Sequence, residues 1–210
     1  PNLLGVPYLV RVLSDTEQSK RGVERFIFFT DAVFAIAITL LALELRMPES
    51  ADLDSETSVI TGLLATIPSF FGYTLSFIVI GAIWATHVRK YRALVEYNKT
   101  FVLLNIILLL FVAFIPFPTA LVSHSDTKTA TILYASTFVM IAITSFIAWK
   151  YAINKKFLSA NITESAIKSG LQNSVIMGCV FLLSIVIALF NADAAKFFWL
   201  LIIPAMHFVR

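Results

Sequence analysis

Residues 25–45 read RFIFFTDAVFAIAITLLALEL, and this stretch decides the fold class. The run from Phe26 to Leu45 has 20 residues and is apolar apart from four of them, Thr30, Asp31, Thr39 and Glu44. As a helix it would be about 30 Å long, which is the thickness of the hydrocarbon core of a bilayer. We therefore predict a transmembrane helix that keeps a carboxylate, Asp31, inside the membrane.

The composition extends this prediction to the whole chain. Of the 210 residues 59% are apolar and 14% are charged, against about 25% charged residues in a soluble domain. The mean hydropathy is +0.86. Cys179 is the one cysteine of the sequence, which excludes a disulfide framework or a zinc cluster built from cysteines. The chain is expected to be an integral membrane protein with no large soluble domain.

Six apolar segments follow one another, and none alternates with a period of two, which argues against a transmembrane β-barrel. We predict an all-α membrane protein with six transmembrane helices per chain, forming one domain over residues 1–210. The second segment contains Pro68 and is taken as one span, with two half-helices broken at Pro68 as the alternative. The predicted spans are about 26–45, 59–86, 101–122, 131–152, 175–190 and 195–208.

The charges between these segments are sorted by sign. If the segments alternate in direction, 13 of the 16 basic residues fall on one side, and the other side holds only Arg46, Lys128 and Lys196. The positive-inside rule then places both termini in the cytoplasm of a multi-pass protein of the cell membrane. The net charge of +3 reflects this sorting, so a nucleic-acid partner is not expected.

Signatures of soluble enzymes are absent from the sequence. It contains no G-x-x-x-x-G-K-[ST], G-x-G-x-x-G, G-x-S-x-G or H-E-x-x-H pattern, and we expect neither catalysis nor a cofactor.

The first helix carries two candidate sites on different faces. At about 100° per residue, Ile36, Leu40 and Leu43 form an apolar stripe with Thr39 beside it, which suits helix packing or lipid contact. Asp31 points away from this stripe, so we expect it to be buried against another helix with hydrogen-bond donors around it. The candidates at similar membrane depth are Arg25, Trp84, His87 and Asn105. Such a cluster suits a structural anchor or a relay for protons or ions.

The pattern Arg25-x-x-x-Phe29-Thr30-Asp31 resembles the R-x-x-x-F-S-D signature of the transmembrane-protein-175 family of potassium channels. Thr30 replaces the serine of the signature and keeps its hydroxyl. The following residues, Ala32 to Leu41, and the Trp84-x-x-His87 stretch are also similar to that family.

The resemblance implies a potassium-selective channel of the bacterial kind, with one six-helix repeat per chain and four chains per channel in the inner membrane. It implies a hydrophobic pore lined by the first helix of each subunit, with Ile36, Leu40 and Leu43 as constrictions and Thr39 next to them. It also implies that Arg25, Thr30 and Asp31 belong to a structural cluster, and that permeating potassium is the only metal ion. Two rival hypotheses are a proton-coupled secondary transporter that uses Asp31 and a membrane assembly protein without transport activity.

Overall fold

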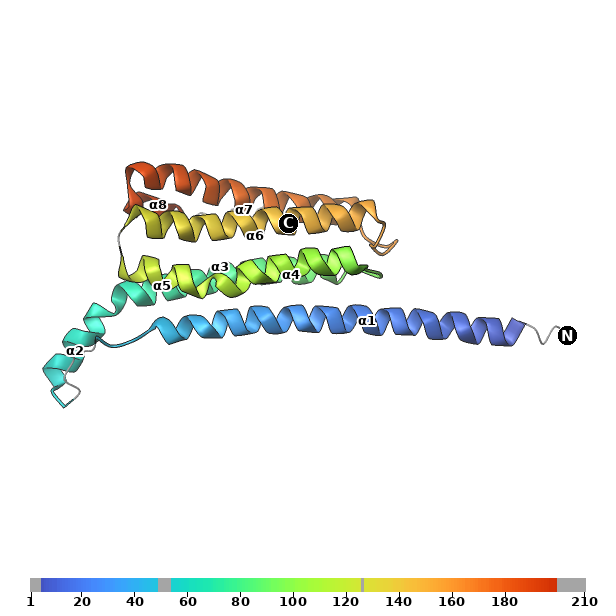
Figure 1. The fold of residues 1–210 in the computed structure, drawn as a ribbon, viewed down its shortest axis with the longest axis horizontal. Helices are drawn as coiled ribbons and strands as arrows, with labels where there is room; N and C mark the ends of the chain where they lie inside the picture. The colour runs from blue at the N-terminus through green and yellow to red at the C-terminus, as the bar shows by residue number, and fades with distance from the viewer. Residues whose placement is uncertain (1–4, 49–53, 126, 200–210) are drawn as a thin grey trace.

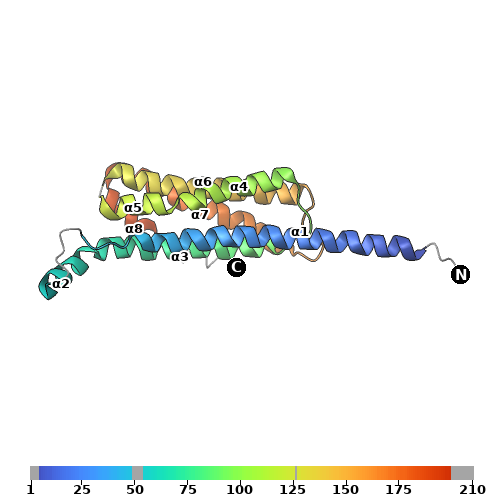
Figure 2. The ribbon, with the colours of Figure 1, turned by 60° about the horizontal axis from the view of Figure 1, so that its bottom comes forward.

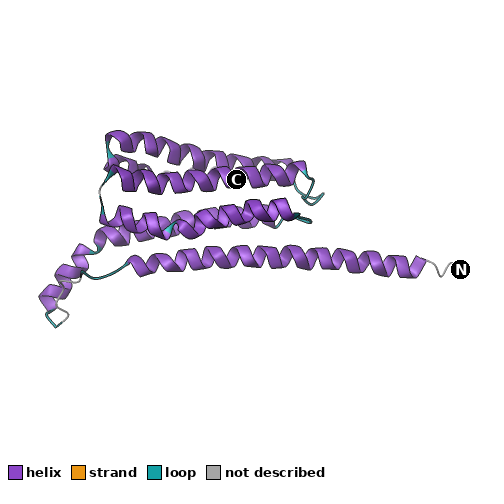
Figure 3. Cartoon of the chain, in the orientation of Figure 1, coloured by secondary structure: helices purple, strands orange, loops and turns teal. Residues whose placement is uncertain are grey.

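The computed structural model describes residues 5–48, 54–125 and 127–199, and these ranges are helical apart from short loops. Figure 3 shows the helices in purple. One isolated bridge joins Leu94 to Leu158 between two of the loops. The elements are α1 (Gly5–Leu40), the short 3-10 helix η1 (Leu41–Glu44), α2 (Glu56–Ala65), α3 (Ile67–Tyr91), α4 (Lys99–Phe114), α5 (Pro116–His124), α6 (Lys128–Asn154), α7 (Glu164–Phe190) and α8 (Ala192–Phe198).

Five stretches in the described ranges are long and apolar enough to cross a bilayer. The prediction of an all-α, multi-pass membrane protein is therefore confirmed. Of the sixth predicted span, residues 195–199 lie at the end of α8 and just after it, and residues 200–208 lie outside the described residues. The five candidate spans are Arg21–Glu44, Ile67–Tyr91, Lys99–His124, Lys128–Asn154 and Glu164–Phe190.

The second apolar run is not one helix, so the prediction of a single span over 59–86 is wrong. Helix α2 ends at Ala65, Thr66 lies between the helices, and α3 begins at Ile67. Pro68 explains the break, because proline has no N–H to donate to the carbonyl of Leu64 and its ring crowds that carbonyl. The hydroxyl of Thr66 instead donates to the carbonyl oxygen of Leu63 at 2.7 Å.

Prolines also divide the third run, where α4 ends at Phe114 and α5 begins at Pro116. Ile115 between them keeps helical dihedral angles, so the run still forms one candidate span from Lys99 to His124. The fifth span begins at Glu164 rather than near residue 175. Its first turns are polar, and Thr163 caps them by accepting a hydrogen bond from the amide of Ala166.

The helices lie side by side in layers, as Figures 1 and 2 show from two directions. Helices α6 and α7 form one antiparallel pair, and α4 packs on α6 while α5 packs on α3. Helix α1 packs along α4 and α3 and extends well past one end of the bundle. The loops that follow α3 and α6 lie at the same end, as the alternation of the predicted spans requires.

Candidate functional site

Helix α1 and its continuation η1 together have one buried and one exposed apolar face. Phe34, Ala37 and Leu41 are almost completely buried in the core, together with residues of α3, α4 and α6. On the other face Ile36 is 58% exposed, and the exposure of Leu40 and Leu43 is 40% and 60%. Among the described residues this second apolar face is not used in packing, so it is available to lipid, another subunit or a pore.

Thr39 adds a hydroxyl to this exposed face. Its Oγ1 donates to the backbone carbonyl oxygen of Ile36 at 2.9 Å, within the same helix. That bond uses the single hydroxyl proton and leaves the oxygen free to accept from another donor or to face a cation.

The other side of α1 is tied to its neighbours through a chain of buried hydrogen bonds. Tyr91 of α3 donates from its hydroxyl to Oδ1 of Asn105 on α4 at 2.9 Å. The amide Nδ2 of Asn105 donates to Oγ1 of Thr30 at 2.9 Å, and Thr30 donates to the carbonyl oxygen of Phe26 at 3.0 Å. Because Thr30 and Asn105 are fully buried, this chain fixes the rotation of α1 against α3 and α4.

Asp31 forms a second tie next to the first. Its carboxylate Oδ1 accepts a hydrogen bond from the indole Nε1 of Trp84 on α3 at 2.9 Å. Asp31 is half-buried and Trp84 is 41% exposed, so this pair lies nearer to the surface of the single chain than the Thr30–Asn105 pair. The hydrogen bonds of Thr30 and Asp31 together attach the part of α1 just before the apolar stripe to α4 and α3.

His87 and Arg25, the other two predicted members of the cluster, are placed differently. The ring of His87 is buried between aromatic rings, 3.7 Å from that of Tyr91 and 5.3 Å from that of Phe34, measured between centroids. Its Nε2 is buried and lacks a partner in the described part of the chain. Arg25 is exposed, and its side chain has no hydrogen bond or ion pair with any described residue. The structure therefore brings five of the six predicted residues together and leaves Arg25 apart.

Tyr91 is the member of the site that the sequence analysis missed. It follows Trp84 and His87 at helical spacing, i+7 and i+4, so it continues their face along α3. That spacing could have identified it.

Within the described residues no group of three or more histidine, cysteine, aspartate or glutamate side chains could hold a metal ion. The polar groups of the site are hydroxyls, amides and one carboxylate, arranged to orient a helix. Fold and site together define a multi-pass helical membrane protein. Its first helix is attached to α3 and α4 by buried and half-buried hydrogen bonds, and its opposite apolar face is exposed on the outside of the helical bundle.

Comparisons with known proteins identify the family. The family model described as "Endosomal/lysosomal potassium channel TMEM175" matches residues 25–116. A potassium channel of Chamaesiphon minutus is 37% identical over 140 residues, which cover 65% of this chain and 68% of that protein. Human TMEM175, named an endosomal/lysosomal proton channel, is 25% identical over 145 residues, which cover 68% of this chain and 28% of the human protein.

The fold agrees with these similarities. The crystal structure of a lysosomal potassium-selective channel TMEM175 homolog from Chamaesiphon minutus superimposes with a TM-score of 0.78 and 26% identity. The match covers 90% of this chain and 99% of that one. The chain belongs to the TMEM175 family, which is a family of ion channels and not of enzymes.

Proposed function

We propose that this protein is a potassium-selective channel, formed by four copies of the chain around a pore that the α1 helices line. The observation that carries the proposal is the exposed stripe of Ile36, Leu40 and Leu43, on the face of α1 opposite to its buried contacts. The names of the relatives support potassium as the permeating ion.

A pore of this kind would select by dehydration. Rings of aliphatic side chains leave no room for the hydration shell of an ion and offer no oxygen ligands in its place. Stripping water from Na⁺ costs more than stripping it from K⁺, so a narrow apolar ring favours K⁺. The Thr39 hydroxyl, beside the stripe, would supply a few oxygen contacts where the ion is partly dehydrated.

The hydrogen bonds behind α1 suit this mechanism. A constriction works only if its radius is held within a fraction of an ångström, which requires a rigid supporting helix. The Thr30–Asn105 and Asp31–Trp84 hydrogen bonds attach α1 to its own subunit between one and two turns before the stripe.

We further propose that residues 1–210 form one six-span domain of the bacterial inner membrane, with both termini in the cytoplasm. The sorting of basic residues supports this orientation. Cysteines introduced at Ser55 and at Lys155, in a background with Cys179 replaced by serine, test it with a membrane-impermeant thiol reagent on intact cells. Labelling only at position 55 supports the orientation, and labelling only at position 155 would show that the protein has the opposite orientation.

The function itself is tested with purified protein in liposomes. A K⁺ gradient without any coupling ion should drive flux, with a smaller flux under an equal Na⁺ gradient, and the mass in detergent should be that of four chains. Saturable counter-flow that requires a proton gradient would instead support the transporter, and absence of any flux would support an assembly role.

Proton conduction is a second candidate function, favoured by the name of the human relative. A carboxylate within the span of α1 gives protons a possible binding group, which an apolar pore lacks. If protons pass through Asp31, proton flux under a pH gradient should fall in Asp31→Asn while K⁺ flux persists. Proton flux unchanged in that variant would exclude Asp31 from the route.

A further inference from the structure

A second polar region lies away from the exposed face of α1. A cavity of about 360 Å³ opens between the last turns of α3, the end of α6 and the first turns of α7. None of its lining residues is acidic, and two of them are cationic. The lining includes Thr86, Arg89, Lys90, Trp149, Ser169 and Asn173.

Lys90 is the feature of this cavity that needs an explanation. Its side chain is only 5% exposed, although buried lysines are normally paired with a carboxylate. Its Nζ donates to Oγ of Ser174 at 2.8 Å and to Oγ of Ser145 at 3.0 Å, and no described acidic group forms an ion pair with it. Nζ also lies 5.9 Å from the ring centroid of Trp149, a cation–π contact. An ammonium group has three N–H donors, so one of them is left without a hydrogen bond, and no described carboxylate balances the charge.

Arg89 places a second positive charge at the exposed side of the same cavity. One of its five N–H donors is used, from Nη2 to Oγ1 of Thr86 at 3.2 Å. The guanidinium group can therefore still form a paired hydrogen bond with an anion such as a phosphate.

The cavity is also lined by a residue with a buried acceptor that has no partner in the described part of the chain. Oδ1 of Asn173 is buried and has no partner among the described residues. Asn173 also borders an adjoining space of about 10 Å³, which is lined as well by His87, the residue with the unpartnered Nε2. That space is large enough for about one water molecule. A bare anion offers no donor to Oδ1 of Asn173, whereas an anion with a hydroxyl group does.

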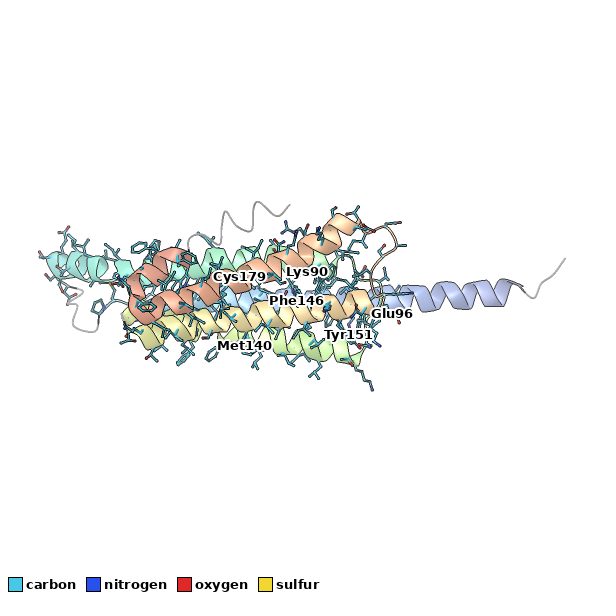
Figure 4. The ribbon with its side chains drawn as sticks, turned by 90° about the horizontal axis from the view of Figure 1, so that it is seen from above. Lys90, Glu96, Met140, Phe146, Tyr151 and Cys179 are labelled. Atoms are coloured by element: carbon cyan, nitrogen blue, oxygen red, sulfur yellow. The ribbon has the colours of Figure 1, made fainter. Side chains whose placement is uncertain are left out.

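Trp149 lines the cavity beside Lys90, and its Nε1 donates to the carbonyl oxygen of Ile167 at 3.1 Å. Gly170 allows this close approach, because a Cβ at that position would lie 2.5 Å from the indole nitrogen. In Figure 4 Lys90 is labelled beside α7, between the middle of the bundle and the end at which Glu96 and Tyr151 are labelled. This end carries most of the basic residues of the chain.

We propose that this cavity binds a phosphate group that carries a neighbouring hydroxyl, of the glycerol-phosphate type. Arg89 and Lys90 contact the phosphate oxygens, and Asn173 accepts from the hydroxyl. The ligand has two possible sources, the headgroup of an anionic phospholipid such as phosphatidylglycerol or a soluble sugar or glycerol phosphate. Basic pockets between helices on the cytoplasmic side are a known setting for anionic headgroups.

The test measures binding to the whole purified protein after removal of co-purified lipid. Native mass spectrometry with phosphatidylglycerol, and with phosphatidylcholine as the reference, examines the lipid source, and calorimetry with glycerol 3-phosphate examines the soluble one. Arg89→Gln removes a charge-assisted paired hydrogen bond at an exposed position, so affinity should fall at least about tenfold. Arg92→Gln is the matched control, because Arg92 is exposed three residues further on and does not line the cavity.

Preferential binding of either probe that is lost in Arg89→Gln and retained in Arg92→Gln supports the proposal, and the probe that binds identifies the source. Lys90→Met, which fills the buried position with an apolar chain, should show the same loss if the variant folds. Binding no stronger than that of phosphatidylcholine, or an equal loss in Arg89→Gln and Arg92→Gln, overturns the proposal. The binding assay does not measure K⁺ flux. A negative binding result would therefore overturn the proposed phosphate site without bearing on the proposed channel function.

Discussion

Replacing Asn105 with leucine should destabilise the protein, because this side chain joins three helices. The substitution keeps the volume but removes the acceptor for the Tyr91 hydroxyl and the donor to Thr30. Thr30 still donates to the carbonyl of Phe26, so the group left unpaired is the buried hydroxyl of Tyr91. An unsatisfied buried donor costs about 1–3 kcal/mol, which sets the expected loss in the free energy of unfolding.

Tyr91→Phe provides the partner for a double-mutant cycle. It leaves Oδ1 of Asn105 unpaired and should cost a similar amount alone. In the double variant both partners are gone, and replacing both by apolar groups is close to neutral for that bond. The coupling energy should therefore be about 0.6–1.7 kcal/mol, from the average to the largest value found for hydrogen bonds between transmembrane helices in such cycles.

Unfolding of the single and double variants in SDS–detergent mixed micelles gives the four free energies that the cycle needs. The substitution Tyr97→Phe is a control, since its hydroxyl donates to the carbonyl of Gly22 rather than to Asn105. Additivity of Tyr91→Phe and Asn105→Leu within about 0.5 kcal/mol would refute the buried hydrogen-bond chain.

Three further outcomes are expected. Asp31→Ala should lower the free energy of unfolding by about 0.6–1.7 kcal/mol, because it leaves the Trp84 indole unpaired, and Trp84→Phe in the same background should add little. Gly170→Ala should destabilise by about 1–3 kcal/mol in the same unfolding assay, since its Cβ would overlap the buried indole of Trp149; a neutral result would mean that the wall can shift. Thr39→Ala should leave the mass of the assembly unchanged and alter the K⁺ to Na⁺ flux ratio, and an unchanged ratio would remove Thr39 from the pore.

The helical, membrane-spanning character of the chain could be predicted from hydropathy, because nearly all of the apolar residues lie in long runs. The break after Ala65 could not be decided in this way. Pro68 forbids one backbone hydrogen bond, but a kinked helix and two separate helices have the same hydropathy. The early start of α7 was missed for a related reason, since its polar first turns carry no hydropathy signal.

In the site, the sequence predicted that Asp31 would be paired with a donor at similar depth but left four candidates, and the structure shows that the donor is Trp84. The hydrogen bonds of Asn105 with Thr30 and of Lys90 with Ser174 join residues 75 and 84 positions apart. No local pattern encodes such pairs. Lys90 in particular has the sequence context of a loop residue, and only the packing of α3 against α6 and α7 shows that it is buried.

The central claim, that α1 lines a potassium pore, is tested most directly by ion flux through liposomes containing Ile36→Asn. Ile147→Asn on α6 is the matched control, since Ile147 is an isoleucine of comparable exposure, 46% against 58%. An amide at a pore constriction supplies hydrogen bonds to water and lowers the barrier to wetting. We predict that Ile36→Asn assembles normally, conducts more current and prefers K⁺ less, while Ile147→Asn behaves as the unmodified protein. Normal assembly of Ile36→Asn with unchanged conductance and selectivity would contradict the account and move the pore away from α1.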